Sequence, residues 1–311
     1  MDADTLTLLR GSLRELLESG PPDIAAALAE LGWDEVVADD AAAANTALFE
    51  EQGETCTATG ALDGIVAAAL DLPASTVVVW PLVTSGPVAS SVLERGSIDV
   101  RGIALRRPAG EAVVPSADGI VAVDAAALEV RPVDGIDPDA GWVHLSGRIP
   151  VVARIGGSWA DAAAAAQRAL ASELVGVSRG TLALATAHVT TREQFGRPIG
   201  SYQSVRHRLA EAHAAIAGAT ALTAAAWADG GVEAAAAAKA VAGWAQVDVA
   251  RHAMQVCGGM GLSWEHGLHR YVKRGYALDA LLGSARLLAR RQGGALLAGL
   301  DPPRVGSPLD A

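Results

Sequence analysis

Apolar and polar positions recur at helical spacing through the first 72 residues. In "TLTLLRGSLRELLES", Leu6, Leu9, Leu13 and Leu16 fall on one face, which predicts an amphipathic helix. A second helix is expected in "DIAAALAELGW", which follows a pair of prolines, because proline suits the first turn of a helix. "LFEEQGET" and "ALDGIVAAALDL" predict two more short helices.

At Pro73 the pattern changes to short β-branched and alternating runs separated by Gly, Pro and Asp. These runs are "STVVVWPLV", "GIALRRP", "GIVAVD", "LEVRPV" and "AGWVHLSGR". They predict about five to six short strands over residues 73–154. The prolines inside this region favour edge strands and turns over long central strands.

From residue 158 the spacing is helical almost to the end of the chain. Long helices are expected at about Trp159–Thr191, Tyr202–Ala228, Glu233–Cys257 and Leu278–Ala298. Helices of this length with short connections predict an antiparallel four-helix bundle. The predicted fold class is therefore α+β and mostly α. It has an N-terminal helical domain (1–72), a small middle β domain (73–157), a C-terminal four-helix bundle (158–298) and a loose tail (299–311).

Composition narrows the function classes. The formal net charge is −11, which disfavours a nucleic-acid partner, since such a partner requires a basic surface. The two cysteines, Cys56 and Cys257, provide neither a disulfide framework nor metal-ligand spacing, which fits a reducing cytoplasm. The alanine runs at 162–166 and 234–238 are too short to span a bilayer, so no membrane association is predicted.

The segment "TREQFGRPIGSYQ" forms a polar elbow between two alanine-rich helices. One interpretation is structural: Arg192 suits the negative end of a helix dipole, Phe195 packs in the core, and Gly196 permits the turn. The other is functional: Arg192 and Gln194 recognise a phosphate or a flavin, using the planar guanidinium. The residues alone leave both interpretations open.

A second unusual segment is "QVCGGMGLSWEHGLHRYVKR". Gly258 and Gly259 close a helix, so they do not meet the dinucleotide-fold fingerprint, in which glycines follow a strand and open a helix. A glycine pair still lets a pyrophosphate approach backbone N–H groups. His266 and His269 are three residues apart, but no third ligand is placed, so no metal site is predicted.

Together the two segments resemble the C-terminal domain of the acyl-CoA dehydrogenase family, which carries an "R-x-Q-F-G" elbow and a later "Q-x-x-G-G-x-G" helix end. The stretch "ASELVGVSRGTLALATAHVTTREQFGRPIGSYQSVRHRLAE" is similar to actinobacterial members throughout, and the strong match covers about residues 158–292. The resemblance implies the three-part acyl-CoA dehydrogenase fold.

The resemblance also implies FAD, an acyl-CoA substrate and an electron-transfer flavoprotein as the redox acceptor. In the family these two segments contact the pyrophosphate and adenosine part of an FAD held mainly by a neighbouring subunit. Carried over, the cofactor-binding residues are Arg192, Gln194, Phe195, Gln203, Gln255, Gly258 and Gly259.

Two departures from the family matter. The segments that cover the flavin ring are reduced to "WPLVTSGPVASS". The family's catalytic glutamate opens the last helix or lies in the first bundle helix, and these positions are Leu282 and Ala166 here. Neither residue accepts a proton, so the catalytic residue is unassigned. Glu173, two turns beyond Ala166, and Asp279, one turn before Leu282, are the candidates for a displaced base.

The leading hypothesis is a non-catalytic subunit of a heteromeric (α2β2) acyl-CoA dehydrogenase. By resemblance, such actinobacterial heterotetramers act on steroid side-chain CoA thioesters, and a catalytic partner chain holds the base and most of the flavin pocket. One alternative is a homomeric, active dehydrogenase with a displaced base. Another is a flavin-free scaffold subunit that retains only the fold.

Overall fold

The computed structural model describes residues 1–299, so most of the predicted tail lies outside the described residues. The N-terminal part consists of α1 (Ala3–Ser19), α2 (Ile24–Glu30), α3 (Trp33–Thr55) and α4 (Ala61–Ala69). The leucine face of α1 packs as its spacing predicts: Leu13 is fully buried, and Leu6, Leu9 and Leu16 are half-buried against the core. Hydrophobic burial therefore docks this helix onto the rest of the molecule.

Helix α3 crosses α5 (Trp159–Thr191) with the two backbones in contact. A Cβ atom at Gly53 would overlap the carbonyl oxygen of Glu173, and one at Gly176 would overlap the carbonyl oxygen of Glu50. Only glycine permits so close an approach. The crossing joins the N-terminal helices to the bundle.

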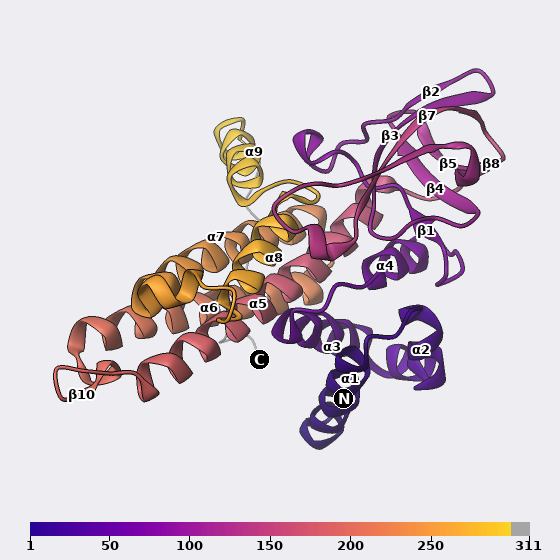
Figure 1. Cartoon of the computed structure of the whole chain (residues 1–311). Helices are drawn as coiled ribbons and strands as arrows, with labels where there is room; N and C mark the ends of the chain where they lie inside the picture. Colours follow the sequence, from indigo (N-terminus) through magenta and orange to yellow (C-terminus); the bar gives the residue numbers. More distant parts are fainter. Residues whose placement is uncertain (300–311) are drawn as a thin grey trace.

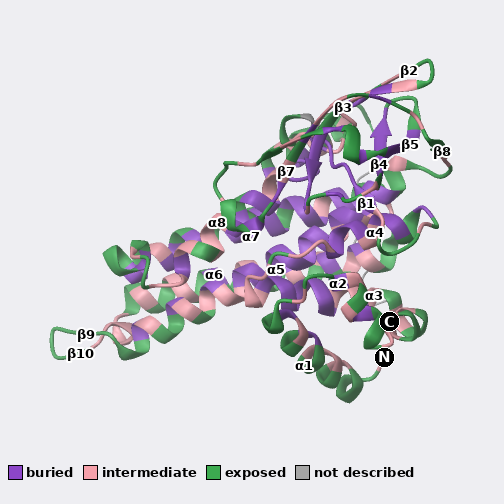
Figure 2. Cartoon of the chain, turned by 45° about the vertical axis from the view of Figure 1, so that its right-hand side comes forward, coloured by how far each residue is buried: buried purple, intermediate pink, exposed green. Residues whose placement is uncertain are grey.

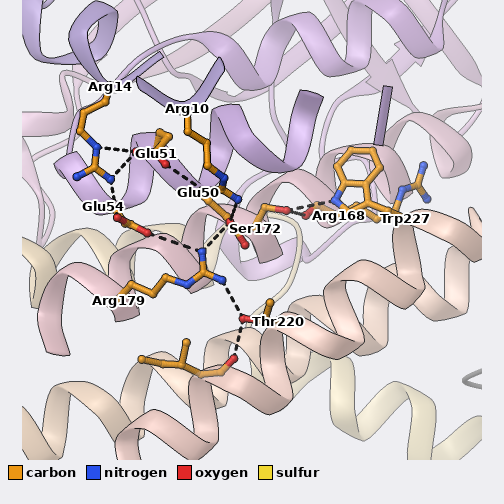
Figure 3. Close-up of polar contacts among 11 residues, drawn as sticks. Arg10, Arg14, Glu50, Glu51, Glu54, Arg168, Ser172, Arg179, Thr220 and Trp227 are labelled. Carbon is orange, nitrogen blue, oxygen red and sulfur yellow. Dashed lines mark hydrogen bonds and ion pairs between the residues drawn. The ribbon is translucent and has the colours of Figure 1, made fainter. Parts of the chain in front are cut away.

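A charge network reinforces this crossing (Figure 3). Glu50 and Glu51 of α3 are both buried. Glu50 accepts hydrogen bonds from Arg10 of α1 and, at 2.6 Å, from Arg179 of α5. Glu51 accepts from Arg14 of α1 at 2.6 Å and 2.8 Å. Each buried carboxylate thus has cationic partners, as burial of a charge requires.

The middle region forms two four-stranded sheets, in the orders β1-β4-β5-β8 and β2-β3-β7-β6. Only β1 and β4 pair in parallel, and every other pairing in the two sheets is antiparallel. The strands are β1 (Val77–Val78), β2 (Val92–Glu94), β3 (Ser97–Ala104), β4 (Glu111–Ser116), β5 (Gly119–Asp124), β6 (Glu129–Pro132), β7 (Val143–Pro150) and β8 (Ala153–Ile155). Valine, isoleucine and leucine side chains from both sheets form their own core.

The region therefore has more strands than the five to six predicted. Two of the additional strands, β2 and β8, have three residues each; β2 pairs with the adjacent β3, and β8 pairs with the more distant β5. Neither strand is long enough to show an alternating pattern of its own. The predicted domain limits at residues 72 and 157 stay predictions.

The C-terminal part contains α5, α6 (Gln203–Asp229), α7 (Val232–Cys257), α8 (Leu268–Ala280) and α9 (Ala285–Leu297). The fold class is confirmed: mostly helical, with a small β region and a C-terminal bundle. At the start of α5, Ser158 accepts a hydrogen bond from the N–H of Asp161 at 3.3 Å, as expected for a helix cap.

The predicted single helix over Leu278–Ala298 is wrong. Helix α8 already begins at Leu268 and ends at Ala280. The helical conformation is interrupted before α9, where Leu282 and Gly283 have φ of 51° and 99°. A residue with positive φ cannot continue a right-handed helix. Ser284 then caps α9 by accepting from the N–H of Leu287 at 3.4 Å.

The long helices of the bundle run along one axis, and the N-terminal helices lie beside them (Figure 1). The sheets lie at one end of the bundle, and a short hairpin, β9 (Glu193–Gln194) with β10 (Arg197–Pro198), lies at the other. Figure 2 shows that this hairpin is exposed. Among the described helices, α6 is long and apolar enough to cross a membrane by length and composition alone, a criterion that core helices of soluble proteins also meet.

Candidate functional site

The predicted elbow is a β-hairpin at the tip of the bundle. Strands β9 and β10 pair in antiparallel register, Gln194 with Arg197 and Glu193 with Pro198. The connecting residues Phe195 and Gly196 have φ of 56° and 79°, as a two-residue type I′ turn requires. The structural interpretation that placed Phe195 in the core is wrong, because its side chain is 91% exposed.

The polar residues of the elbow are directed to solvent. Arg192, Gln194 and Gln203 are all exposed. Within residues 1–299 the Arg192 guanidinium has no hydrogen-bond or ion-pair partner, although its backbone N–H caps α5 by donating to His188 at 2.9 Å. The side-chain amide of Gln194 donates only to the adjacent carbonyl of Glu193, at 2.8 Å. These groups are free to bind a ligand from outside the chain.

The glycine segment lies at the end of α7. Gly258 caps that helix with φ 56° and donates its N–H to the carbonyl of Met254, so it does serve as a helix end. Gly258 and Gly259 are exposed, as is Gln255 one turn earlier, and no atom would obstruct a Cβ at either glycine. The backbone here is therefore open to a ligand. Gly261 differs, because its Cβ would lie 2.9 Å from Cβ of Cys257.

The elbow and the glycine segment share one small apolar cluster. Val189 of α5, Val256 of α7 and Leu268 of α8 are buried there, and Ile199 and Val205 of the elbow side pack against them. Because these side chains are shared, the structure brings the two predicted cofactor-binding segments to the same end of the bundle.

Two histidines, one from each segment, lie close together at the same end of the bundle. The rings of His188, in the last turn of α5, and His266, after the glycine segment, lie 5.5 Å apart, edge to face. Burial lowers the pKa of His188, and the nearby His266 and Arg192 lower it further. Burial also raises the pKa of the Cys257 thiol to about 11. Both groups are thus neutral at pH 7 in the absence of a ligand.

The two positions that hold the base in the family are sealed in the core. Ala166 and Leu282 are 0% and 1% exposed. The side-chain amide of Gln167 donates to the carbonyl of Leu282 at 2.9 Å, which binds the loop before α9 to α5. Neither position offers a carboxylate or an opening toward a substrate.

The two candidate displaced bases have structural partners. Glu173 is 1% exposed and accepts hydrogen bonds at 2.7 Å and 3.2 Å from Arg274. Asp279 Oδ1 accepts from the N–H of Ala285 at 2.9 Å. Beside it, the buried Lys239 Nζ donates to the carbonyls of Asp279 and Gly283, and burial lowers the pKa of Lys239 to about 8. Asp279 thus holds the break before α9 in place, and Glu173 joins α5 to α8.

The elbow and the base positions lie far apart within one chain. At 1.5 Å of rise per residue, α5 separates Ala166 from Arg192 by about 40 Å. In Figure 1 the hairpin lies at the end of the bundle remote from the sheets. One copy of the chain therefore cannot present both to the same small ligand.

Sequence patterns did not anticipate one grouping, that of His188, Cys257 and His266. Their potential ligand atoms all lie within 4.8 Å of one another. The three residues belong to different segments of the chain, so no local motif signals them. The sequence places His269 three residues after His266. Its ring instead packs against Trp264, with the two ring centroids 4.7 Å apart.

Comparison with known proteins adds the family context. Residues 156–291 match the family described as acyl-CoA dehydrogenase, C-terminal domain. The acyl-CoA dehydrogenase FadE34 of Mycobacterium tuberculosis is 37% identical over 59% of this chain and 27% of its own length. The acyl-CoA dehydrogenase IpdE2 of the same organism is 38% identical over 39% of this chain and 38% of its own length.

This chain thus spans well under half the length of either relative. Among solved structures, the ChsE4-ChsE5 complex from Mycobacterium tuberculosis contains a similar chain, with a TM-score of 0.79 and 20% identity. The match covers 98% of this chain and 99% of that one. At this identity the likeness establishes a shared fold.

Proposed function

We propose that this chain, whose residues 156–291 match the C-terminal domain of acyl-CoA dehydrogenases, is a non-catalytic subunit of an FAD-dependent acyl-CoA dehydrogenase. In this proposal a catalytic partner chain holds the base and most of the flavin. This chain contributes contacts to the pyrophosphate and adenosine part of FAD across the interface. The contacting residues are Arg192, Gln194, Phe195, Gln203, Gln255, Gly258 and Gly259.

The observation that carries the proposal is the separation of about 40 Å along α5 between the elbow at Arg192 and the base position at Ala166. A flavin bound at the elbow has to react in another chain's catalytic centre. This chain's own base positions, Ala166 and Leu282, are apolar and buried. We therefore assign the elbow to a flavin that is shared with a partner.

The residues at the elbow fit the charged half of FAD. Within residues 1–299 the Arg192 guanidinium has no partner, and arginine forms strong, bidentate hydrogen bonds with phosphate. Gly258 and Gly259 offer exposed backbone with open space beside it. When bound, FAD supplies the hydride acceptor for desaturation of an acyl-CoA thioester. This chain's part is to bind and orient it.

Exposed apolar side chains at the same end support a protein interface. Phe195, Leu262 and Trp264 are 91%, 71% and 82% exposed. A type I′ turn itself favours Asn-Gly, so the turn does not account for a phenylalanine at position 195. Large exposed apolar groups gathered at one place mark interaction surfaces. We assign this surface to the partner chain and its flavin.

The finer points of the proposal follow from the family. The partner is an acyl-CoA dehydrogenase subunit in an α2β2 assembly, and the likeness to a chain of the ChsE4-ChsE5 complex supports a heteromer. We propose an acyl-CoA substrate of the steroid side-chain type, an electron-transfer flavoprotein as acceptor, and a cytoplasmic location.

The test is co-expression of this chain with an acyl-CoA dehydrogenase chain that retains the base, beginning with the product of the neighbouring gene. We expect one flavin per pair of chains, bound only in the complex. Arg192→Ala should weaken flavin retention by at least about tenfold, because a charge-assisted hydrogen bond is worth about 1.5–3 kcal/mol. The exposed Arg148 of β7, at the far end of the molecule, gives the matched control Arg148→Ala, which should have no effect.

Two results contradict the proposal, and each favours a different alternative. A flavin-loaded, active homo-oligomer of this chain alone would favour the homomeric dehydrogenase. A complex without flavin absorbance, or one whose flavin content is unchanged by Arg192→Ala, would favour the scaffold subunit.

A further inference from the structure

We propose that His188, Cys257 and His266 form a Zn²⁺ site at the elbow end of the bundle. His188 lies in the last turn of α5, Cys257 is the final residue of α7, and His266 precedes α8. Their ligand atoms all lie within 4.8 Å of one another. The thiol is buried and both imidazoles are half-buried, so the group lies just beneath the surface.

The donor set selects the metal. Two imidazole nitrogens and one thiolate sulfur are borderline-soft ligands, which suit Zn²⁺ and do not suit Mg²⁺ or Ca²⁺, since those ions require oxygen. Three protein ligands leave the fourth tetrahedral position to water. Zn–N and Zn–S bonds of about 2.0–2.3 Å place ligand atoms roughly 3.3–3.6 Å apart. The cluster must therefore contract by about 1 Å, which side-chain rotation of the half-exposed histidines allows.

The ligand atoms have few competing partners. Within the part of the chain that the structure describes, the ring nitrogens of His188 form no hydrogen bond. The sulfur of Cys257 forms none there either. Nδ1 of His266 accepts one bond, from the N–H of Leu268 at 3.3 Å. That long contact is lost whichever His266 nitrogen binds metal, because the other nitrogen then carries the proton.

The neighbouring histidine is already engaged. Nδ1 of His269 lies 2.9 Å from the carbonyl oxygen of His266, and its ring contacts Trp264. The second cysteine, Cys56, lies at the end of α3 and lines a separate cavity with Asp137 and Arg274. These two residues therefore serve as matched controls, with the same chemistry outside the cluster.

The site would join the segments that the proposed function assigns to flavin binding. His188 is one helical turn before Arg192, and Cys257 is adjacent to Gly258. A bound ion would thus fix the end of α5 relative to the end of α7. This consequence rests on the proposed function, whereas metal binding itself does not.

The experiment uses the full chain alone, stripped of metal with a chelator, without FAD and without a partner. Titration with Co²⁺ should show one ion per chain, visible bands of a four-coordinate ion and a thiolate-to-cobalt charge-transfer band, all displaced by Zn²⁺. Cys257→Ser should abolish the charge-transfer band. His188→Gln and His266→Gln should each weaken binding more than about tenfold, since even second-shell partners of metal ligands are worth 10–100-fold.

Cys56→Ser and His269→Gln should bind Co²⁺ as the wild type does. The site is refuted if no thiolate band forms, if the band survives Cys257→Ser, or if Cys56→Ser removes it equally. Binding of several Co²⁺ ions that none of the three ligand variants weakens is surface binding, and also refutes it. His188 and His266 are only half-buried, so their variants test the site even if Cys257→Ser fails to fold.

Discussion

Glu173 and Arg274 form a buried ion pair that joins α5 to α8. The carboxylate accepts from Nη2 and Nε of the guanidinium at 2.7 Å and 3.2 Å, and the two residues are 1% and 4% exposed. The third nitrogen of Arg274, Nη1, lies 4.0 Å from Asp137 and has no hydrogen-bond partner within residues 1–299. A carboxylate held in this way stabilises the bundle and is not positioned to remove a substrate proton.

We expect Arg274→Met to lower the free energy of unfolding by about 3–5 kcal/mol, because it leaves Glu173 charged, buried and unpaired. The double variant Glu173→Leu/Arg274→Met should recover most of that loss, since an apolar pair of similar volume needs no solvation. Urea denaturation of the wild type and both variants measures the effect. Equal stability of the single and double variants would contradict the account.

Neither candidate displaced base should matter for turnover. Glu173→Gln and Asp279→Asn preserve shape, and a general base is worth about 10²–10⁴-fold in rate. We expect the turnover of the folded complex to change by less than about twofold, measured by steady-state acyl-CoA oxidation normalised to flavin. A loss of a hundredfold with flavin still bound would restore the homomeric alternative.

Asp63 should make stability depend on pH. Burial raises its pKa from 3.8 to about 7, although a hydrogen bond from Trp80 Nε1 and the nearby Arg106 oppose the shift. The folded chain therefore keeps this proton up to about pH 7, while the unfolded chain loses it near pH 4. Stability from Asp63 is complete below pH 4 and is lost as the pH rises toward 7.

The expected loss across this window is on the order of 4 kcal/mol, at 1.36 kcal/mol per pKa unit. Asp63→Asn keeps an acceptor for Trp80 and cannot ionise, so it isolates the effect. The measurement is the difference in unfolding free energy between wild type and Asp63→Asn from pH 4 to 8. A difference that is constant, or that grows in favour of the wild type with rising pH, would contradict this assignment.

Substitution by alanine should affect stability in opposite directions at two glycines, one at the α3–α5 crossing and one on the exposed face of α6. Gly176→Ala should destabilise the protein by about 1–3 kcal/mol or more, because its Cβ would overlap the Glu50 carbonyl oxygen. Gly218→Ala, in the exposed interior of α6 with open space around it, should stabilise by up to about 1 kcal/mol. Thermal unfolding of the two variants gives the comparison, and equal midpoints would show that the crossing tolerates a Cβ.

Phe195→Asn should separate stability from function. Asparagine adopts positive φ more readily than phenylalanine, so the chain alone should be unchanged or more stable by up to about 1 kcal/mol. The complex should nevertheless lose flavin or partner affinity, measured by flavin absorbance and gel filtration. An unchanged complex would show that the exposed ring has no role at the interface.

Local patterns in the sequence determined much of this protein. Periodic leucine and alanine positions predicted the long helices α5, α6 and α7. The elbow at Arg192 and the glycines at Gly258 and Gly259 were identified because each is a contiguous motif. Such features depend on residues within a few positions of one another, which a sequence displays directly.

The tertiary structure alone decided the features that depend on distant residues. It paired Glu173 with Arg274, sealed Leu282 in the core, and broke the last helix where Leu282 and Gly283 adopt positive φ. It also brought His188 to Cys257 and exposed Phe195, which hydrophobicity alone places inside. Burial and pairing arise only when helices pack, because each side chain's partners come from segments that local propensity does not relate.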